Sequence, residues 1–434
     1  MTRLRAALTL AAVSVPALLA AQQPPVCSAD NAGLTLPKGF CATVFADRVG
    51  GARHAVVASN GDVLINARPS QSGGESGTGT GPGGGILLLR DANGDGRAEL
   101  VKKLASATGT GIAIANGFLY ATDRNTVVRF AYTPGDTALG ASEIVIGSLP
   151  EGGHTANNFV VVGPTLYLNI GSRTNSCQEK DRQSNSKGVD PCVELETRAG
   201  VWRFDALKTG QTPKDGVRYS TGIRNAVALT WNAKAKQLWV AMHGRDQLAQ
   251  NWGRSNEESA ENPGEEIFPL AEGADFGWPY CYWSTYEKKL VLAPEYGGDG
   301  KAVGRCSSKR APTYVFPGHW APNDIGFYTG TSFPARYREG VFVAFHGSWN
   351  RAPLPQAGFR VSFVPLKNGK AAGEAETFAD GFTPPQFLGG PAAPGSAAGA
   401  RQHRPSGLAV TKDGGLIVTD DFGGTVYKII YTGK

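Results

Sequence analysis

His154 lies in a short segment, Gly152–Thr155, that ends just before the apolar run Phe159–Gly163. The unperturbed pKa of imidazole lies near neutrality, so histidine is a natural side chain for taking a proton from a hydroxyl group. The two glycines ahead of His154 and its place before an apolar run favour such a chemical role. The alternative is a structural histidine at the start of a strand.

The run after His154 is one copy of a repeated pattern: an apolar strand, a small polar turn and a second apolar strand. Six copies occur, at His54–Arg68, Gly111–Tyr132, Phe159–Arg173, Ala226–Gly244, Asp324–Arg351 and Pro405–Tyr431. Such strands, separated by Gly, Asn and Asp, indicate a blade-by-blade β architecture. We therefore predict an all-β fold, a six-bladed β-propeller. A histidine or arginine just before such a strand would then lie at the inner, funnel end of a blade.

The first residues are organised like a secretory signal peptide. Arg3 and Arg5 form a charged region, Ala6–Ala20 is apolar, and Ala21 follows as a small residue for cleavage. We predict a cleaved signal peptide over 1–21, a single propeller domain over 27–434, and a periplasmic or secreted protein. The alternative is an uncleaved anchor, although the run is short for a membrane span. No later stretch is apolar enough for a span, so none is expected.

The six cysteines fall into three close pairs, and an even number in an exported chain favours disulfides. Proximity predicts Cys27–Cys41, Cys177–Cys192 and Cys281–Cys306, although six cysteines allow about fifteen connectivities. The sequence has no C-x-x-C or C-x-x-C-H motif, so neither a zinc site nor a covalently attached haem is expected.

Composition excludes several other classes of protein. The formal net charge of +6 is mild and unclustered, so we expect no nucleic-acid partner. The 58 Gly and 27 Pro, against two Met, fit a loop-rich β chain better than a helical bundle. A formal G-x-G-x-x-G at Gly79–Gly84 is followed by the strand-like run Ile86–Arg90 and no helix, which argues against dinucleotide binding.

Asp91, Asn93 and Asp95 alternate with small residues between two strand-like runs. Oxygen ligands at this spacing, followed by glycine, are typical of calcium loops. The twelfth position holds Lys102 where an EF-hand has glutamate, so the segment is not an EF-hand. An ordinary Asp/Asn/Gly turn is an equal alternative, and a bound calcium would be structural.

Six blocks of sequence, in order, resemble the soluble quinoprotein sugar dehydrogenases, the glucose/sorbosone dehydrogenase family that binds pyrroloquinoline quinone (PQQ). The resemblance extends from Leu36 to Tyr431. The blocks are Gly152–Thr155, Thr221–Asn225, His243–Asp246, Gly264–Ile267 with Asp275–Pro279, Phe345–Arg351 and His403–Gly407. The family fold is a six-bladed propeller, in agreement with the count of repeats.

The resemblance implies roles for residues of the first three blocks. His154 matches the catalytic base. Arg224 and Asn225 match a pair at the quinone, where a guanidinium can stabilise negative charge. Gly244 and Arg245 match positions that bind the cofactor's calcium through backbone carbonyls. His243, next to them, is assigned to the cofactor site.

The later blocks imply further contacts. Arg404 matches a basic residue that holds a PQQ carboxylate, and Arg351 is assigned to a second one, with His346 as the next choice. Trp349 or Trp278 could cover a planar ring, although a core position is commoner for tryptophan. The remaining pair, Glu265 and Glu266, would either bind a second calcium or fix the following turn.

Four positions depart from the family pattern. Asn157 and Asn158 stand where an arginine follows the catalytic histidine, His243 replaces a glutamine, and Gln402 replaces one of two arginines. Fewer cations around a polyanionic cofactor should weaken its binding.

These features favour a PQQ- and calcium-dependent dehydrogenase that oxidises the C1 hydroxyl of an aldose, or a hydrated sugar aldehyde such as that of sorbosone. A cytochrome c would be a suitable electron acceptor. The alternatives are a calcium-dependent sugar-lactone hydrolase and a non-catalytic carbohydrate-binding propeller. The sequence does not specify the sugar or the oligomeric state.

Overall fold

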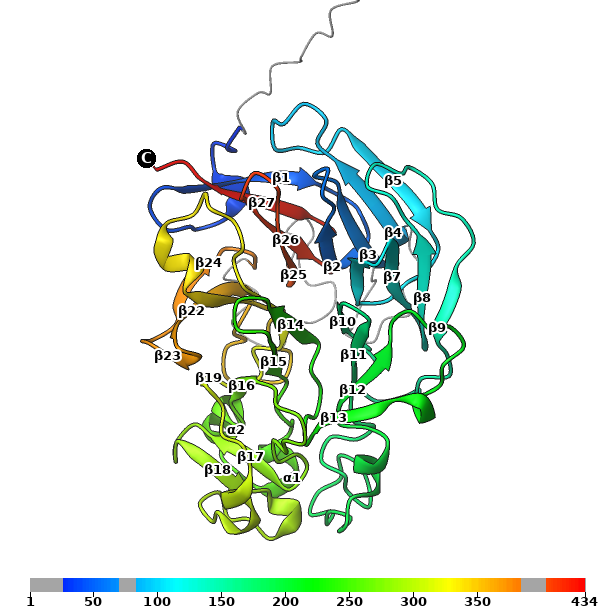
Figure 1. Cartoon of the computed structure of the whole chain (residues 1–434). Helices are drawn as coiled ribbons and strands as arrows, with labels where there is room; N and C mark the ends of the chain where they lie inside the picture. Colours follow the sequence, from blue (N-terminus) through cyan, green and yellow to red (C-terminus); the bar gives the residue numbers. More distant parts are fainter. Residues whose placement is uncertain (1–25, 70–82, 384–402, 434) are drawn as a thin grey trace, which may run out of the picture.

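A computed structural model describes residues 26–69, 83–383 and 403–433. Its strands form six sheets of four or five strands, which are arranged as the blades of a propeller (Figure 1). Each predicted copy of the repeat supplies at least the first two strands of one blade, so the predicted six-bladed fold is confirmed. The predicted signal peptide over 1–21 lies outside the described residues, as do Gln402 and most of Gly79–Gly84.

The first three blades are regular antiparallel sheets. Blade 1 contains β2 (Gly51–Val57), β3 (Val63–Pro69), β4 (Gly83–Arg90) and β5 (Leu100–Ala105). Blade 2 contains β6 (Ile112–Ala115), β7 (Phe118–Asp123), β8 (Thr126–Ala131) and β9 (Glu143–Ile146). Blade 3 contains β10 (Phe159–Val162), β11 (Thr165–Ile170), β12 (Gly200–Asp205) and β13 (Val217–Thr221).

The last three blades carry the insertions and the closure. Blade 4 contains β14 (Ala228–Asn232), β15 (Gln237–Met242), β16 (Glu265–Pro269) and β19 (Tyr314–Phe316). Blade 5 contains β20 (Pro322–Gly326), β21 (Gly340–Phe345) and β22 (Arg360–Lys367), with β23 (Lys370–Ala371) and β24 (Glu376–Ala379) both paired to β22. Blade 6 contains β25 (Pro405–Val410), β26 (Leu416–Asp420), β27 (Val426–Tyr431) and β1 (Phe40–Ala46).

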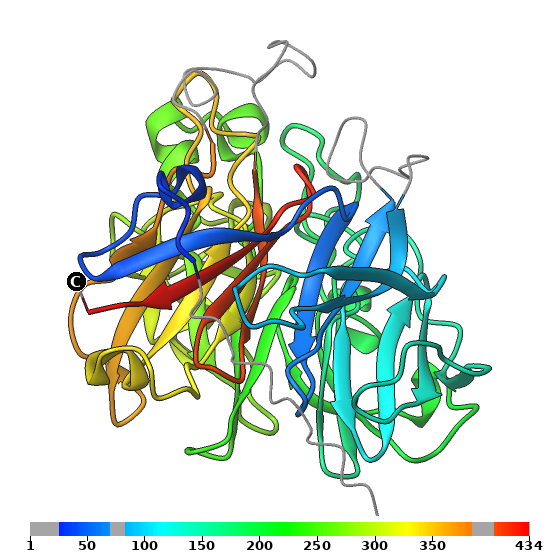
Figure 2. The same ribbon diagram turned by 90° about the horizontal axis from the view of Figure 1, so that it is seen from above.

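The sixth blade contains strands from both ends of the sequence, because the first strand, β1, pairs antiparallel with the last strand, β27. Figure 2 shows the blue strand β1 beside the red strand β27. The innermost strands, β2, β6, β10, β14, β20 and β25, each contact the next, and β25 contacts β2. The ring is therefore closed around a central axis.

Apolar side chains fill the space between neighbouring blades. Six separate core clusters each join one blade to the next. Trp239 of blade 4, for example, is fully buried and meets Phe327 of blade 5 edge to face, with 5.6 Å between ring centroids. Both faces of a blade are covered, which explains why many strands are apolar throughout instead of alternating.

Inner strands start, and second strands end, at the same face of the ring, which we call the upper face. Blade 3 inserts residues 171–199 there, between β11 and β12. Blade 4 inserts two short helices, α1 (Leu248–Trp252) and α2 (Asn256–Glu261), and a hairpin of β17 (Cys281–Ser284) and β18 (Lys289–Leu292). The insertions share a core with Trp278 and two disulfides, and they lie side by side in Figure 1.

The three predicted disulfides, Cys27–Cys41, Cys177–Cys192 and Cys281–Cys306, are present. Six short 3-10 helices complete the described secondary structure: Asn31–Gly33, Val193–Glu196, Pro213–Asp215, Pro294–Tyr296, Gly304–Ser308 and Ala335–Arg338. Among the described residues, no helix has the length and apolar character needed to cross a membrane.

Candidate functional site

All six histidines of the chain lie on the upper face. Each is placed in or before an inner strand, or directly after a second strand. His54 is in β2, His243 follows β15 and His346 follows β21, whereas His154, His319 and His403 precede β10, β20 and β25. The repeat thus brings imidazoles from far apart in the sequence to one funnel.

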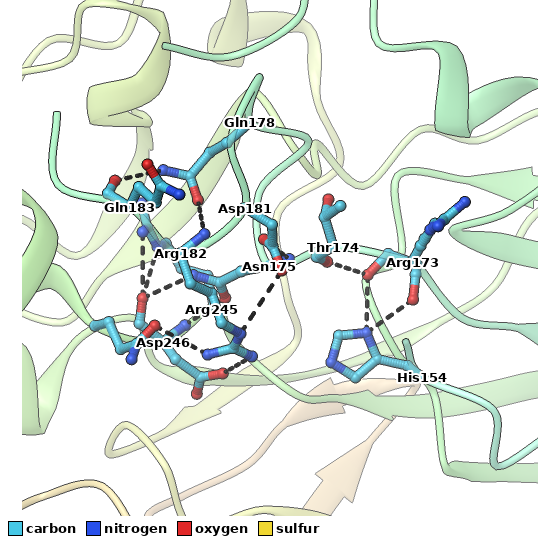
Figure 3. A network of polar contacts seen from close by, with 12 residues as sticks. His154, Arg173, Thr174, Asn175, Gln178, Asp181, Arg182, Gln183, Arg245 and Asp246 are labelled. Carbon is cyan, nitrogen blue, oxygen red and sulfur yellow. Dashed lines mark hydrogen bonds and ion pairs between the residues drawn. The ribbon is translucent and has the colours of Figure 1, made fainter. Parts of the chain in front are cut away.

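The His154 ring is held by Ser172 at the end of blade 3's second strand. Its Nδ1 lies 2.9 Å from the Ser172 carbonyl oxygen and 3.0 Å from Ser172 Oγ (Figure 3). A carbonyl oxygen can only accept, so Nδ1 carries the proton and donates it. The neutral ring then has its lone pair on Nε2, which has no hydrogen-bond partner among the described residues.

The surroundings of His154 favour its neutral form. Burial, and then the positive charge of Arg224, hold the pKa of His154 well below its usual range. An imidazole that is neutral at ordinary pH and presents Nε2 can accept a proton from a bound hydroxyl group.

Arg224 is the centre of a second group of contacts. Its guanidinium donates to the Asn175 backbone oxygen at 3.1 Å, the Asn175 side chain at 3.0 Å, the Gly244 carbonyl at 2.7 Å and Asp246 Oδ2 at 2.9 Å. Although burial alone would raise the pKa of the Asp246 carboxyl, Arg224 holds it well below its usual range. The side chain of Arg224 is therefore fixed as a buried cation with a partner carboxylate.

Asp246 joins four segments of the upper face. Besides Arg224, it accepts from Arg182 Nη2 at 2.9 Å and from Asn350 Nδ2 at 2.9 Å, and His319 Nδ1 lies 3.6 Å away. Figure 3 shows Asp246 beside Arg182 and Asn175 of the blade 3 insertion. Loops of blades 3, 4 and 5 are thus tied together at one carboxylate.

Asn225 and His243 lie next to this group. Asn225 Oδ1 is buried and has no hydrogen-bond partner within the described part of the chain. His243 Nε2 donates to the Pro322 carbonyl oxygen at 2.8 Å, and burial lowers the pKa of His243 to about 4. The only N–H of this neutral ring is already bound to Pro322, so a ligand could not accept a hydrogen bond from His243. A ligand could, however, donate a hydrogen bond to Nδ1.

Gly244 and Arg245, the residues predicted to bind calcium through their carbonyls, are held by separate contacts. The Gly244 carbonyl accepts from Arg224, and the Arg245 guanidinium pairs with the buried Glu295 at 2.6 Å. Glu265 accepts from the Gly244 N–H at 2.9 Å, which fixes this loop. Burial raises the pKa of Glu265 to about 7 and that of Glu266 to about 8.

A second network runs through blades 5, 6 and 1. Asp421 accepts from Arg53 on one oxygen and from His346 Nε2 on the other, at 2.5 and 2.7 Å. His346 Nδ1 lies 3.2 Å from Arg404 Nη1, which can only donate, so Nδ1 accepts and Nε2 carries the proton. The Arg404 guanidinium also lies over the rings of Phe359 and Phe422. His346 therefore orients Arg404, the residue predicted to hold a carboxylate.

Arg351 is held by neighbouring loops, and the two tryptophans differ in their exposure. The Arg351 guanidinium donates to Glu261 at 2.6 Å and to the backbone oxygens of Ala260, Gly318 and Pro355. Its predicted cofactor contact stays a prediction and would require these partners to be exchanged. Trp278 is a buried core residue, whereas Trp349 is about half exposed on the upper face.

The predicted calcium loop at Asp91–Glu99 is a hairpin tip between β4 and β5, on the face opposite the funnel. Carboxylate oxygens of Asp91, Asp95 and Glu99 lie within 4.8 Å of one another. Both oxygens of Asp91 already accept from the N–H groups of Gly94 and Gly96. These bonds account for the turn, and calcium binding here stays a prediction.

The two asparagines at the departing positions are structural in their contacts. Asn158 is buried and donates to the Val227 carbonyl oxygen at 2.6 Å, which links the inner ends of blades 3 and 4. Asn157 is also buried and lies 3.4 Å from the Arg124 carbonyl oxygen. Neither side chain takes the place of an arginine in the funnel.

The cations of the funnel suit an anionic ligand such as PQQ. Among the described residues, the funnel includes Arg53, Arg68, Arg224 and Arg404, with two paired carboxylates, Asp246 and Asp421. A Cβ on Gly171 would lie 2.7 Å from the Cβ of His154 and 3.3 Å from Asn225 Oδ1, so glycine lets His154 and Asn225 lie close to the backbone here.

Sequence reasoning missed several members of the funnel. Asp246 is the last residue of one of the blocks quoted above, and Asp421 directly follows β26, the second strand of blade 6. Their positions in the sequence could therefore have identified both residues. Arg53 directly precedes the first repeat and Arg68 is its last residue, so their positions could also have identified them. His319 lies between repeats, and no pattern in the sequence singles it out.

Comparisons with known proteins agree with this fold. A family model described as TrAA12-like matches residues 34–432. The structure is similar to the holo form of the PQQ domain of a pyranose dehydrogenase from Coprinopsis cinerea (TM-score 0.69, 19% identity, 94% of this chain and 98% of that chain). It is also similar to a calcium structure of a Trichoderma reesei carbohydrate-active enzyme of family AA12 (TM-score 0.71, 18% identity, 92% and 97% covered).

Sequence relatives match over shorter stretches. A PQQ-dependent pyranose dehydrogenase of Coprinopsis cinerea is 28% identical over 226 residues, 46% of this chain. A protein of Borreliella burgdorferi is 28% identical over 213 residues, 48% of this chain. The aligned regions span 28% and 48% of the lengths of these two relatives.

Proposed function

Because the chain belongs to the TrAA12-like family, we propose that it is a PQQ-dependent sugar dehydrogenase. Its substrate would be the C1 hydroxyl of an aldose, or a hydrated sugar aldehyde such as that of sorbosone, and its product a lactone or an acid. The observation that carries this proposal is the neutral His154 with its lone pair on Nε2, at the end of a funnel rich in arginine.

His154 would act as the general base. The Ser172 carbonyl fixes the ring and keeps the proton on Nδ1, so the substrate's hydroxyl proton would pass to Nε2. Burial, and then the charge of Arg224, lower the pKa of His154, so the ring is unprotonated at neutral pH and Nε2 is free to take the proton. The imidazolium formed would then return the proton to solvent.

The cofactor would be held by the cations of the funnel. Arg224 and Asn225 on one side and Arg404 on the other are suited to its oxygens and carboxylates, with His243 beside them. PQQ, when bound, would accept the hydride from the sugar carbon. Calcium held by the Gly244 and Arg245 carbonyls would act as a Lewis acid that polarises the quinone carbonyl. Asp246 and His346 would keep the two arginines in place before any ligand arrives.

Export is part of this proposal. Three disulfides are suited to an oxidising compartment, so we place the protein in the periplasm or outside the cell. An electron acceptor such as a cytochrome c would then reoxidise the cofactor.

The first experiment is to reconstitute purified protein with PQQ and calcium and to follow the quinone absorbance while aldoses are added. Saturable binding followed by sugar-dependent bleaching is expected. Protein that binds no PQQ at micromolar concentration but hydrolyses sugar lactones would overturn the proposal in favour of a hydrolase.

The second experiment tests the base. His154→Ala should lower kcat by about 10²- to 10⁴-fold while PQQ still binds. The control is Ser172→Ala, which removes the hydroxyl but keeps the backbone carbonyl that holds Nδ1, and which should cost less than about tenfold. An unchanged kcat in His154→Ala would remove this residue from the mechanism.

A further inference from the structure

Two arginines of blade 1 meet above the start of blade 2. Arg53 lies in the inner strand β2, and Arg68 lies near the end of β3, opposite Gly51. Arg53 Nε is 3.4 Å and Arg68 Nη2 is 3.2 Å from the same acceptor, Thr110 Oγ1, which precedes β6. Two guanidinium groups therefore share one neutral hydroxyl at the upper face.

The nearby carboxylate cannot neutralise both arginines. One oxygen of Asp421 is paired with Arg53, and the other accepts from His346. No ion pair of Arg68 occurs among the residues that the structure describes, although the side chain is only partly exposed. Burial, and then the charge of Arg53, lower the pKa of Arg68 to about 10, so the group is still a cation at neutral pH.

A glycine at the start of β2 lets Arg68 and the Asp421 backbone lie close to this strand. A Cβ on Gly51 would lie 3.4 Å from the Cβ of Arg68 and 3.1 Å from the Asp421 backbone oxygen. A cation that is partly removed from water and has no carboxylate in direct contact is costly, and a ligand that supplies such a contact recovers part of this cost. Guanidinium is also the side chain best matched to a carboxylate, through two parallel N–H donors.

We propose that Arg68, supported by Arg53 and Thr110, binds a carboxylate group of a ligand in the funnel. Arg68 is separate from Arg224 and Arg404, the residues assigned above to the cofactor. The carboxylate has two possible sources, the cofactor itself or an acidic sugar such as a uronic acid. The choice between them rests on the proposed function, whereas the carboxylate site does not.

The carboxylate site can be tested without any activity. The probe is malonate, added to full-length protein at constant ionic strength with chloride as the reference anion, and the readout is the rise in Tm. Wild type should be stabilised by malonate in a saturable way. Arg68→Gln should weaken the apparent Kd by tenfold or more, and Arg68→Lys should recover part of it.

The matched control is Arg203→Gln, which removes an exposed arginine of blade 3 that pairs with Glu272. It should respond to malonate as wild type does. An equal malonate response in wild type and Arg68→Gln, or the same loss in the control, would overturn the proposal. Circular dichroism of each variant separates loss of binding from loss of folding.

The source of the carboxylate is then decided by two titrations. If the cofactor supplies it, Arg68→Gln raises the Kd for PQQ, measured by protein fluorescence, by about 10- to 100-fold. If the substrate supplies it, the Kd for PQQ is unchanged, and the preference for a uronic acid over the matching aldose, as kcat/KM, falls tenfold or more. A wild type that binds malonate but not PQQ refutes the proposed function and leaves the carboxylate site standing.

Discussion

The contact between Asp421, Arg53 and His346 gives a prediction whose size can be worked out from the structure. The three side chains are 4%, 7% and 11% exposed. Asp421→Asn keeps the shape of the side chain but removes its charge. The new amide can accept from Arg53 on its oxygen, and its NH₂ group then faces the His346 Nε2–H, donor against donor.

His346 cannot relieve this conflict by moving its proton. If the proton shifted to Nδ1, that nitrogen would meet Arg404 Nη1 at 3.2 Å, again donor against donor. The variant is left with an uncompensated buried arginine as well. Breaking a buried ion pair from one side costs about 3–5 kcal/mol, which for a chain of this size corresponds to a fall in Tm of roughly 4–6 °C.

The assay is thermal unfolding at pH 7 of Asp421→Asn, Arg53→Met and the double variant. The double variant should be more stable than the sum of the single effects predicts, by at least about 1 kcal/mol, because removing both partners leaves no unpaired charge. Glu272→Gln, at the exposed pair with Arg203, is the control and should change stability by under about 1 kcal/mol.

The pH dependence gives the same test a second readout. Although burial alone would raise it, contacts with His346 and Arg53 hold the pKa of Asp421 far below its usual value of 3.8. Its contribution to stability is present above this unfolded-state value and is lost as the pH falls below it. The gap between wild type and Asp421→Asn should therefore narrow at acid pH. Additive single effects at pH 7, with a gap that does not depend on pH, would refute the reasoning.

Three further predictions concern the base, a disulfide and a buried acid. Because the pKa of His154 is held well below 6.5, the acidic limb of kcat/KM should lie well below pH 6.5, and a pH–rate profile that falls off at or above this value would contradict the assignment. Replacing both Cys177 and Cys192 by serine opens a loop with a sequence separation of 15 and should cost about 3 kcal/mol, seen as a lower Tm; an unchanged Tm would argue against it. Burial raises the pKa of Glu266 to about 8. The stability contributed by its uncharged form is therefore fully present below the usual glutamate pKa of 4.5 and is lost as the pH rises towards 8. Glu266→Gln should therefore gain about 2 kcal/mol on wild type between pH 6 and pH 9, whereas a constant difference in Tm would point to a carboxylate that is ionised throughout, as a calcium ligand would be.

The repeated strands and the cysteine pairs could be predicted because they are local properties of the sequence. Each copy of the repeat, such as Phe159–Arg173, contains its two strands and its turn within a few residues. The resemblance to quinoprotein sugar dehydrogenases is confirmed by the family match and by the fold of the similar structures.

The partners of the charged side chains could not be predicted in this way. Asn175 and Asp246 are 71 residues apart, and Arg53 and Asp421 are 368 residues apart. The first pair meets because blades 3 and 4 are neighbours, and the second meets only when the ring closes. Arg351 is a further example. Its place in one of the family blocks suggests a contact with a ligand, whereas in the structure its guanidinium donates to backbone carbonyls of the neighbouring loops.

The pairing of β1 with β27 sets the order in which the molecule can become functional. Asp421 lies between the last two strands, and the arginine it neutralises lies in β2, so this part of the funnel requires both ends of the chain. A chain still being synthesised or translocated has blades, but it has no closed ring and no complete set of cations. Such long-range pairing forms late, because the entropy of closing the whole chain is lost before any contact compensates for it. The affinity for an anionic ligand should therefore appear in one step, after the final strand is released.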